Sequence, residues 1–439
     1  MSNIFRAYDI RGIYPEEINT DIGKRVGNAV ARYLKAKTIV VGEDGRIGSP
    51  ELRQAVIGGI TSAGADVIYI GQCTTPLFYF AVKQTVADGG IMVTASHNPA
   101  EYNGLKITEA GGVPLGIDEG LLEVKELANN FVEAVNKGKV TDNKGLKDQY
   151  IDFLIKNSGI KPGVIKNKMI VDTGNGMGSL IIPPLFDKLR IDYTPLNFEI
   201  DGKFPNRSPD PAHQGALDQL KKEVVEQKAD LGIAFDGDAD RLAVVDEKGD
   251  WIPAQFILAL LWQAKPVKTV YDSRFSKAVR EFIGSYGIRS MVGHTHVAGT
   301  MRHSSAELGG ETSGHFFFKD MNYTESAALA ALKLMHFVQE NKKPLSELVK
   351  PLNKYFYSGE VATEMKDIKK SEGIIKVLKE KYSDGKQDIF DGLTVEYPEW
   401  WFNVRPSNTE PLLRLVVEAN TEELMEEKKK ELIQALSSF

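Results

Sequence analysis

The sequence predicts an α/β protein, in which three related α/β domains in tandem precede a C-terminal α+β domain. Its 439 residues suffice for three or four domains, since one domain takes about 150 residues. Short apolar strands alternate with amphipathic helical stretches through the first half, which is typical of layered folds with a mainly parallel sheet. The last part of the chain differs, because several strands there precede one closing helix.

The first half contains the clearest elements. Strands are predicted at 38–41, 66–70 and 91–94, where β-branched residues run up to a glycine or a polar loop. Helical patterns cover 49–63 and 76–87, between these strands. The alternating order favours parallel pairing of the strands.

A faint internal repeat indicates how the domains follow one another. A lysine, a short apolar strand and a polar turn occur in this order at 37–44, 168–175 and 268–274. Such a repeat is typical of related domains in tandem, although any strand of an α/β protein has a similar pattern. The predicted domains are 1–150, 151–252, 253–355 and 356–439.

The C-terminal domain is predicted to be α+β. Strands are expected at 394–397, 401–404 and 412–418, around a loop. One helix is expected at 421–436, with Asn420 or Thr421 as its N-cap and acidic residues in its first turn.

The charge and composition of the chain exclude some classes of binding partner. The net charge of -6 argues against a general affinity for nucleic acid or anionic membranes. A single cysteine, Cys73, excludes an internal disulfide and a cysteine-based zinc cluster, and it fits a reducing cytoplasm. We expect a cytoplasmic protein that acts on small molecules, because the sequence has neither a signal-peptide pattern nor a membrane-spanning apolar run.

Ser96 lies in a polar segment, 94–99, directly after an apolar run. Ligands gather at the C-terminal ends of strands in open α/β sheets, so this segment is a candidate site. A serine hydroxyl becomes nucleophilic only beside a base or in a strong electrostatic field, and His97 and Lys106 are the nearby candidates. The alternative is a polar turn with capping residues.

Three carboxylates alternate in the segment 235–241: Asp236, Asp238 and Asp240. They would repel one another beside apolar strands unless a cation lay among them, and a hard divalent ion with oxygen ligands fits best. An EF-hand loop starts with the same spacing, but Arg241 stands where that loop needs glycine. The flanking segments also read as strands rather than helices.

Two further loops carry groups that suit a sugar phosphate. In 309–315, glycines flank Glu311 and Ser313, whose carboxylate and hydroxyl suit the vicinal hydroxyls of a sugar. In 405–411, Arg405 stands beside hydroxyls, an amide and backbone N–H groups that suit a phosphate. The alternatives are a glycine-rich hairpin turn and a proline-punctuated turn. The sequence contains no dinucleotide-binding glycine motif and no Walker loop, so nucleotide binding lacks support.

Together, the four segments resemble the α-D-phosphohexomutase superfamily, most closely its phosphomannomutase/phosphoglucomutase branch. The resemblance covers essentially the whole chain and includes the opening 5–12 and the stretch 204–206. It implies α/β domains with mixed sheets and a C-terminal α+β domain, arranged around a central active-site cleft. One motif from each domain would face that cleft.

The resemblance also implies a role for each segment. Ser96 would carry the phosphoryl group, and the three aspartates would hold Mg²⁺ together with an oxygen of that phosphate. Glu311 and Ser313 would bind the 3- and 4-hydroxyls of the sugar. The phosphate that does not react would be held by Arg405, Ser407, Asn408 and Thr409. Further cleft positions of similar enzymes are matched by Tyr8, Arg11, His97, Lys106, Arg241, Arg274, His294 and His315.

Two positions, Ala239 and Arg274, depart from the pattern of similar enzymes, and a third, Thr312, bears on the choice of sugar. Ala239 stands where many have glycine, and its methyl group is tolerable unless the backbone there needs a positive φ. Arg274 stands where lysine is common, so the charge is kept but its reach and geometry differ. Thr312 argues mildly against a glucosamine substrate, since glutamine is usual there in enzymes for that sugar.

The implied reaction moves a phosphoryl group between C1 and C6 of hexose phosphates, of mannose, glucose or both. Phospho-Ser96 would give its phosphoryl group to the free hydroxyl, and the resulting hexose 1,6-bisphosphate would turn over and return the other phosphate. Glucose 1,6-bisphosphate is the expected activator. Lys106 and His294 are both candidates for the general base, and Arg241 would help to neutralise developing charge.

Other functions remain open at this point. The nearest is a phosphoglucosamine or N-acetylglucosamine-phosphate mutase. A phosphatase with a serine nucleophile would instead release inorganic phosphate steadily. A non-catalytic sugar-phosphate-binding protein would bind hexose phosphates without turnover. A monomer and a homodimer are both compatible with the sequence.

Overall fold

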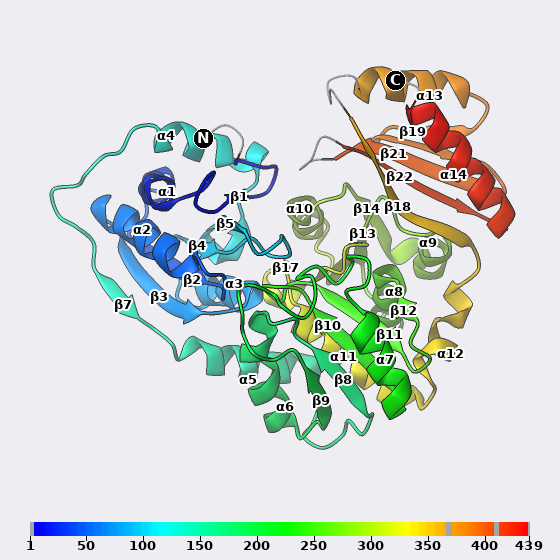
Figure 1. Cartoon of the computed structure of the whole chain (residues 1–439), viewed down its shortest axis with the longest axis horizontal. Helices are drawn as coiled ribbons and strands as arrows, with labels where there is room; N and C mark the ends of the chain where they lie inside the picture. Colours follow the sequence, from blue (N-terminus) through cyan, green and yellow to red (C-terminus); the bar gives the residue numbers. More distant parts are fainter. Residues whose placement is uncertain (1–3, 366–370, 408–411, 438–439) are drawn as a thin grey trace.

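The computed structural model describes residues 4–365, 371–407 and 412–437. Its described strands form four sheets, of which three mix parallel and antiparallel pairs and the fourth is wholly antiparallel (Figure 1). The predicted architecture of three α/β units followed by an α+β unit is therefore confirmed.

The first sheet has the strand order β1-β5-β4-β2-β3-β7, with β6 paired to β5. The strands predicted at 38–41, 66–70 and 91–94 are confirmed as β2, β3 and β4, and the two predicted helices are α2 and α3. The elements are β1 (Ile10–Ile13), α1 (Thr20–Tyr33), β2 (Thr38–Glu43), α2 (Ser49–Ser62), β3 (Asp66–Gln72), α3 (Thr75–Gln84), β4 (Gly89–Val93), β5 (Tyr102–Glu109), β6 (Val113–Pro114), α4 (Leu121–Ala128) and β7 (Val140–Asp142).

The second and third sheets have five strands each, in the orders β12-β11-β10-β8-β9 and β14-β13-β15-β16-β17. The second unit contains α5 (Leu146–Ser158), β8 (Met169–Asp172), α6 (Ile182–Leu189), β9 (Tyr193–Leu196), α7 (Asp218–Gln227), β10 (Leu231–Phe235), β11 (Leu242–Asp246) and β12 (Trp251–Ile252). The third contains α8 (Ala254–Ala264), β13 (Thr269–Asp272), α9 (Lys277–Ile283), β14 (Gly287–Ser290), α10 (His294–Ser304), β15 (Leu308–Gly310), β16 (Phe316–Phe318), β17 (Thr324–Glu325), α11 (Ala327–Asn341) and α12 (Leu345–Val349).

The fourth sheet has the order β18-β22-β21-β20-β19. Its unit contains β18 (Phe356–Glu364), α13 (Ser371–Lys381), β19 (Lys386–Asp388), β20 (Leu393–Glu396), β21 (Trp400–Pro406), β22 (Leu412–Ala419) and α14 (Glu422–Ser437). The predicted strands and closing helix are confirmed, and Thr421 is the cap, since its hydroxyl accepts a hydrogen bond from the N–H of Leu424 (3.2 Å). β18 was not predicted, because its side chains are exposed or half-buried and lack the apolar alternation of a core strand.

The three α/β units share one topology. Their sheets contain the equivalent orders β5-β4-β2-β3, β11-β10-β8-β9 and β16-β15-β13-β14, in which three parallel strands end in an antiparallel fourth. The repeated lysine-strand-turn pattern falls on β2, β8 and β13, which occupy the same place in each sheet. The interpretation of the repeat as tandem related units is therefore confirmed.

The apolar core is divided between these units unevenly. One large cluster runs through the first three units and includes Phe78 of α3, Phe186 of α6 and Phe316 of β16. The fourth unit has its own cluster, which includes Phe402 of β21 and Leu432 of α14. Figure 1 shows the fourth unit, in orange and red, beside the others rather than between them. It is thus packed as a body of its own.

Candidate active site

A cleft of about 2010 Å³ brings together residues of all four units. Most of the predicted site residues line it: Tyr8, Arg11, Ser96, His97, Lys106, Arg241, Arg274, His294, Glu311, Ser313, His315, Arg405 and Ser407. The three aspartates are fully buried beneath its floor. Asn408 and Thr409 lie outside the described residues.

Topology explains why three of the motifs meet. The serine, aspartate and Glu311 loops each connect the third parallel strand of a unit to its antiparallel strand, between β4 and β5, β10 and β11, and β15 and β16. The loops also touch directly, because a Cβ atom on Gly237 would lie 2.5 Å from the carbonyl oxygen of Ser96. Only glycine permits that approach of the aspartate loop to the serine.

Ser96 is held in an uncommon conformation, with a φ of 51° and 2% of its surface exposed. Its hydroxyl donates to Oδ2 of Asp236 (3.1 Å) and lies 3.2 Å from Nδ1 of His97. Its backbone N–H donates to the hydroxyl of Thr94 (2.9 Å). The serine loop therefore fixes the hydroxyl against the aspartate loop of the next unit.

Arg46 clamps the serine loop from behind, although the sequence did not indicate it. Its Nη2 donates to the carbonyl oxygens of Ser96 (2.8 Å) and Asn98 (2.5 Å), and its Nη1 to those of Pro99 (2.6 Å) and Tyr102 (3.0 Å). The guanidinium is 2% exposed and lies beyond the end of β2. One buried side chain thus satisfies four carbonyl oxygens that shape the loop.

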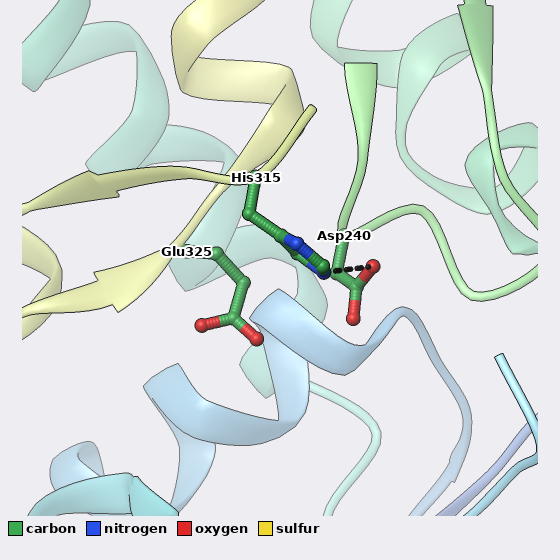
Figure 2. A group of neighbouring side chains, drawn as sticks. All are labelled: Asp240, His315 and Glu325. Atoms are coloured by element: carbon green, nitrogen blue, oxygen red, sulfur yellow. Dashed lines mark ion pairs between the residues drawn. The ribbon is translucent and has the colours of Figure 1, made fainter. Parts of the chain in front are cut away.

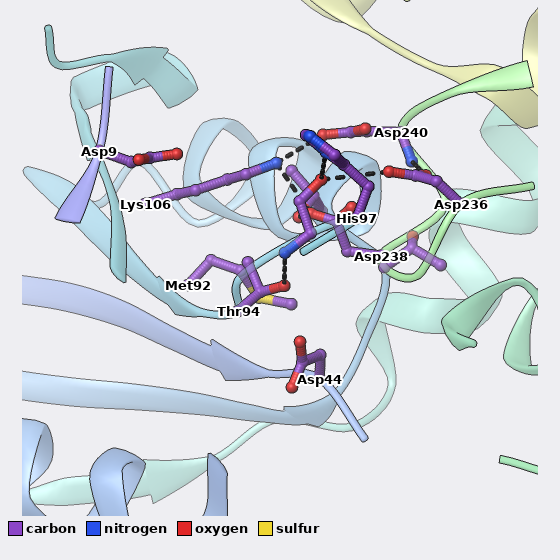
Figure 3. A network of polar contacts seen from close by, with 12 residues as sticks. Asp9, Asp44, Met92, Thr94, His97, Lys106, Asp236, Asp238 and Asp240 are labelled. Atoms are coloured by element: carbon purple, nitrogen blue, oxygen red, sulfur yellow. Dashed lines mark hydrogen bonds and ion pairs between the residues drawn. The ribbon is translucent and has the colours of Figure 1, made fainter. Parts of the chain in front are cut away.

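Two of the three carboxylates of the aspartate loop pair with the ammonium group of Lys106 (Figure 3). Lys106 Nζ lies 2.8 Å from Oδ2 of Asp238 and 2.5 Å from Oδ2 of Asp240. Asp236 instead accepts two backbone N–H bonds within the loop, through Oδ1. The hydroxyl of Thr75, at the start of α3, donates to Asp238 (2.6 Å) and was not predicted.

The charges of this loop are unevenly compensated. Burial and the neighbouring Asp240 and Asp238 raise the pKa of Asp236 well above its usual value. Burial alone would also raise the pKa of Asp240, but the charge of Lys106 outweighs it and the pKa falls well below normal. The same pairing raises the pKa of Lys106 despite its burial, so this amine is protonated at neutral pH.

The donor set fits a hard divalent cation. One ligand oxygen from each aspartate lies within 4.8 Å of the others. Oδ1 of Asp238 is buried without a hydrogen-bond partner among the described residues, and Oδ1 of Asp240 faces only Nε2 of His315, at 3.3 Å. Buried carboxylate oxygens are costly unless a cation or donor meets them, so a candidate metal site of three oxygens is present.

Ala239 has a φ of 58°, so the loop does require the left-handed backbone that disfavours a methyl group. This backbone costs a non-glycine residue about 1–2 kcal/mol. Glycine would remove that cost but lose a buried methyl and gain chain entropy in the unfolded state, about 0.5–1 kcal/mol each. We therefore expect Ala239→Gly to change the free energy of unfolding by less than about 0.5 kcal/mol, measured by urea denaturation.

The matched control is Ala243→Gly in β11, where φ is not positive. Glycine relieves nothing there, so a loss of about 1–2 kcal/mol is expected. Equal losses in the two variants would show that the loop stores no strain at Ala239.

The Glu311 loop is organised around His315. Its Nδ1 lies 2.9 Å from the hydroxyl of Ser313 and 3.3 Å from Oε2 of Glu311, and its Nε2 lies 3.3 Å from Oδ1 of Asp240. Burial would lower the pKa of His315, but Asp240 outweighs it and raises the pKa to about 10. The pKa of Glu311 falls to about 2 despite burial, because His315 donates to it.

His294 lies at the start of α10, with its ring centroid 6.4 Å from that of His315. Its ring centroid lies 5.1 Å from that of Tyr8, whose hydroxyl donates to the carbonyl oxygen of Val292 (3.0 Å). Burial and the charges of Lys106 and His315 lower the pKa of His294 to about 4. The ring is thus neutral at neutral pH and can accept a proton.

Glu360 of β18 gathers three arginines at the boundary of the third and fourth units. Its Oε2 lies 2.7 Å from Nη1 of Arg274 and 3.3 Å from Nη2 of Arg405, and its Oε1 lies 3.0 Å from Nη1 of Arg414. Nε of Arg405 is buried without a hydrogen-bond partner among the described residues. Glu360 therefore holds three guanidinium groups close together, where they can bind an anion.

Glu360→Gln should weaken this boundary in a pH-dependent way. Burial would raise the pKa of Glu360, but Arg274 and Arg405 lower it to about 2, below the normal value. The ionised form thus stabilises the fold above about pH 4.5, and this contribution is lost as the pH falls through 2. We expect Glu360→Gln to cost about 2 kcal/mol at pH 7, measured by thermal unfolding, and less at pH 3.

Glu364→Gln is the control, because Glu364 is exposed at the end of the same strand. It should leave the unfolding temperature unchanged at both pH values. A pH-independent loss in Glu360→Gln would indicate a packing effect and contradict the electrostatic explanation.

Comparison with known proteins identifies the family. Models of the phosphoglucomutase/phosphomannomutase family match four consecutive segments: alpha/beta/alpha domain I at 2–131, domain II at 148–249, domain III at 248–355 and the C-terminal domain at 357–435. A phosphomannomutase of Methanocaldococcus jannaschii is 37% identical over 441 residues, covering 98% of this chain and 96% of that protein. One from Escherichia coli K12 is 35% identical over 453 residues, covering 99% and 98%.

A solved structure agrees with these sequence matches. The crystal structure of a phosphoglucomutase/phosphomannomutase family protein from Burkholderia thailandensis superposes with a TM-score of 0.89 at 29% identity, covering 100% of this chain and 98% of that one. Among the described residues, every helix is too short or too polar to cross a membrane. Since phosphomannomutases match from end to end and each unit matches its counterpart in order, the chain belongs to the phosphoglucomutase/phosphomannomutase family and is an isomerase, an intramolecular phosphotransferase acting on hexose phosphates.

Proposed function

We propose that this enzyme moves a phosphoryl group between C1 and C6 of mannose or glucose phosphates through phospho-Ser96. The observation that carries the proposal is the place of the Ser96 hydroxyl, 3.1 Å from Asp236 and facing a cleft that all four units line. A group at this point can reach a substrate while cations from other units surround it. Phosphoryl transfer depends mainly on such positioning and charge neutralisation.

Mg²⁺ is the cofactor that the three aspartates would hold, together with an oxygen on Ser96. Oxygen-only ligands are those that Mg²⁺ prefers, and when bound it would neutralise charge on the phosphoryl group. Lys106 and Arg241 would add fixed positive charge beside the reacting atoms, since both line the cleft next to the aspartate loop. Glucose 1,6-bisphosphate would act as the activator by phosphorylating Ser96.

His294 is the better candidate for the general base. The pKa of His294 is lowered to about 4, so the ring is free to accept the proton of the attacking hydroxyl. The pKa of Lys106 is raised by Asp238 and Asp240, which outweigh its burial, so it donates charge rather than accepts a proton. Both side chains line the cleft.

The sugar and the distal phosphate would be held by the other two units. Glu311 and Ser313 would accept and donate hydrogen bonds to the 3- and 4-hydroxyls, which lie between C1 and C6 and exchange places when the sugar turns round. These contacts do not involve the hydroxyl on C2, at which mannose and glucose differ, so both sugars would bind. Arg274, Arg405 and Ser407 line the part of the cleft suited to the phosphate that does not react. The remaining walls of the cleft would be formed by Tyr8, Arg11, His97 and His315.

The test is a product assay with the full-length protein and Mg²⁺. Mannose 1-phosphate and glucose 1-phosphate should be converted to the 6-phosphates, glucose 1,6-bisphosphate should accelerate the conversion, and inorganic phosphate should stay constant. Steady phosphate release would indicate a phosphatase. Faster conversion of glucosamine 1-phosphate than of either hexose phosphate would overturn the proposed substrate, and binding without any turnover would indicate a sensor.

We also propose the domain limits 1–150, 151–252, 253–355 and 356–439, since the strands of each sheet fall within one of these ranges. The first limit falls inside α5 (Leu146–Ser158), and the whole of that helix is assigned to the second unit. A cytoplasmic location is proposed from the single cysteine, which is buried as a free thiol and needs no oxidising compartment. Monomer and homodimer are both compatible with this function.

A further inference from the structure

A second cluster of ligating side chains lies behind the aspartate loop. It consists of Asp240, His315 and Glu325, which come from the β10–β11 loop, the β15–β16 loop and β17 (Figure 2). One ligand atom of each lies within 4.8 Å of the other two. Glu325 has no part in the proposed reaction, yet only 1% of its surface is exposed.

The carboxylates of this cluster are incompletely satisfied. Oε2 of Glu325 has no hydrogen-bond donor among the described residues, and Oδ1 of Asp240 faces only Nε2 of His315, at 3.3 Å. The other oxygen of Glu325 accepts from the hydroxyl of Tyr79 (3.2 Å), and the other oxygen of Asp240 contacts Lys106. Buried carboxylate oxygens without a partner cost several kcal/mol unless a cation reaches them.

His315 is already oriented as a ligand. Its Nδ1 faces the carboxylate of Glu311 at 3.3 Å, and its Nε2 faces Oδ1 of Asp240 at 3.3 Å. Figure 2 shows the ring pointing at Asp240, with the Glu325 carboxylate on its other side. An imidazole that is held by a carboxylate through one nitrogen and turned inward with the other is the usual arrangement around a bound metal.

We propose that Asp240, His315 and Glu325 form a second cation site that takes a first-row transition ion such as Zn²⁺. One imidazole and two carboxylates are the donors such ions prefer, whereas Mg²⁺ prefers oxygen alone. Asp240 belongs to this triad and to the three-aspartate site, so its carboxylate bridges the two sites. The competing explanation is that Glu325 serves only to accept the hydrogen bond of Tyr79, between β17 and α3.

Cobalt binding in the presence of Mg²⁺ separates these explanations. Full-length protein, freed of metal with a chelator and then saturated with Mg²⁺, is titrated with Co²⁺ and followed by visible d–d absorption and calorimetry. The wild type should bind one further equivalent of Co²⁺, and Glu325→Gln should weaken that binding by about 100-fold. Tyr79→Phe and Asp236→Asn should retain it, since neither residue belongs to the second triad.

Two results would overturn the proposal. Complete suppression of Co²⁺ binding to the wild type by Mg²⁺ would mean that the aspartates form a single shared site. An unchanged affinity of Glu325→Gln for Co²⁺, together with a native circular dichroism spectrum, would show that Glu325 is not a ligand. If that variant fails to fold, the wild type still decides, because it should hold one Co²⁺ and one Mg²⁺ together, whereas Co²⁺ that displaces Mg²⁺ from the three-aspartate site would leave one metal ion in total. The readout is binding, so it is independent of whether the protein transfers phosphate through Ser96.

Discussion

Ser96→Ala should lose the bound phosphoryl group and at least about 10⁴-fold in kcat for the conversion of glucose 1-phosphate, the scale of loss when an enzyme nucleophile is removed. The hydroxyl that donates to Asp236 is the carrier in the proposed reaction, and no other described side chain takes its position at the aspartate loop. The methyl group of alanine fits where the hydroxyl was, so folding should persist. Intact-mass spectrometry and a coupled mutase assay measure the two effects.

Ser313→Ala is the matched control for the mass measurement. Ser313 lines the same cleft but lies on the Glu311 loop, so this variant should lose activity and still carry one phosphoryl group after incubation with glucose 1,6-bisphosphate. Wild-type protein should lose that phosphoryl group when excess hexose phosphate is added, as the proposed transfer to the substrate requires. A wild type that never acquires the group, or a phosphorylated Ser96→Ala variant, would exclude Ser96 as the carrier.

The four motif loops were predictable because each begins where an apolar strand ends. The sequence shows such strands directly, and the carboxylate spacing in 235–241 already demanded a cation. Their meeting in one cleft could be inferred only through the family resemblance, since the distances among β4, β10 and β15 are set by packing between units.

Residues that act across long sequence separations were missed. The local sequence around Arg46 predicts a surface residue in a polar turn. Its function depends on the fold of the serine loop, 50 residues away. Glu360 stands on an edge strand with no apolar pattern, and its role depends on Arg274, 86 residues away. Likewise, Thr75 donates to the aspartate loop and Glu325 lies near Asp240, each from an element whose placement local patterns do not encode.

His294→Gln should lower kcat by about 10²- to 10⁴-fold, the usual contribution of a general base. Glutamine keeps the size of the ring and a hydrogen-bonding group but cannot accept the proton. The pKa of His294 is lowered to about 4 by burial and by the charges of Lys106 and His315. The base is therefore competent above about pH 4, and wild-type kcat should fall only as the pH drops through that value.

The pH profile distinguishes a base from a positioning residue. His294→Gln should lose the acid limb near pH 4, whereas a variant that only misplaces the substrate would keep the limb at lower activity. His303→Gln, at the exposed end of the same helix, is the control and should match the wild type. If His294→Gln keeps kcat within about tenfold of the wild type, the proton must go to another acceptor, and Lys106 would then have to lose its proton once the carboxylates beside it bind a metal.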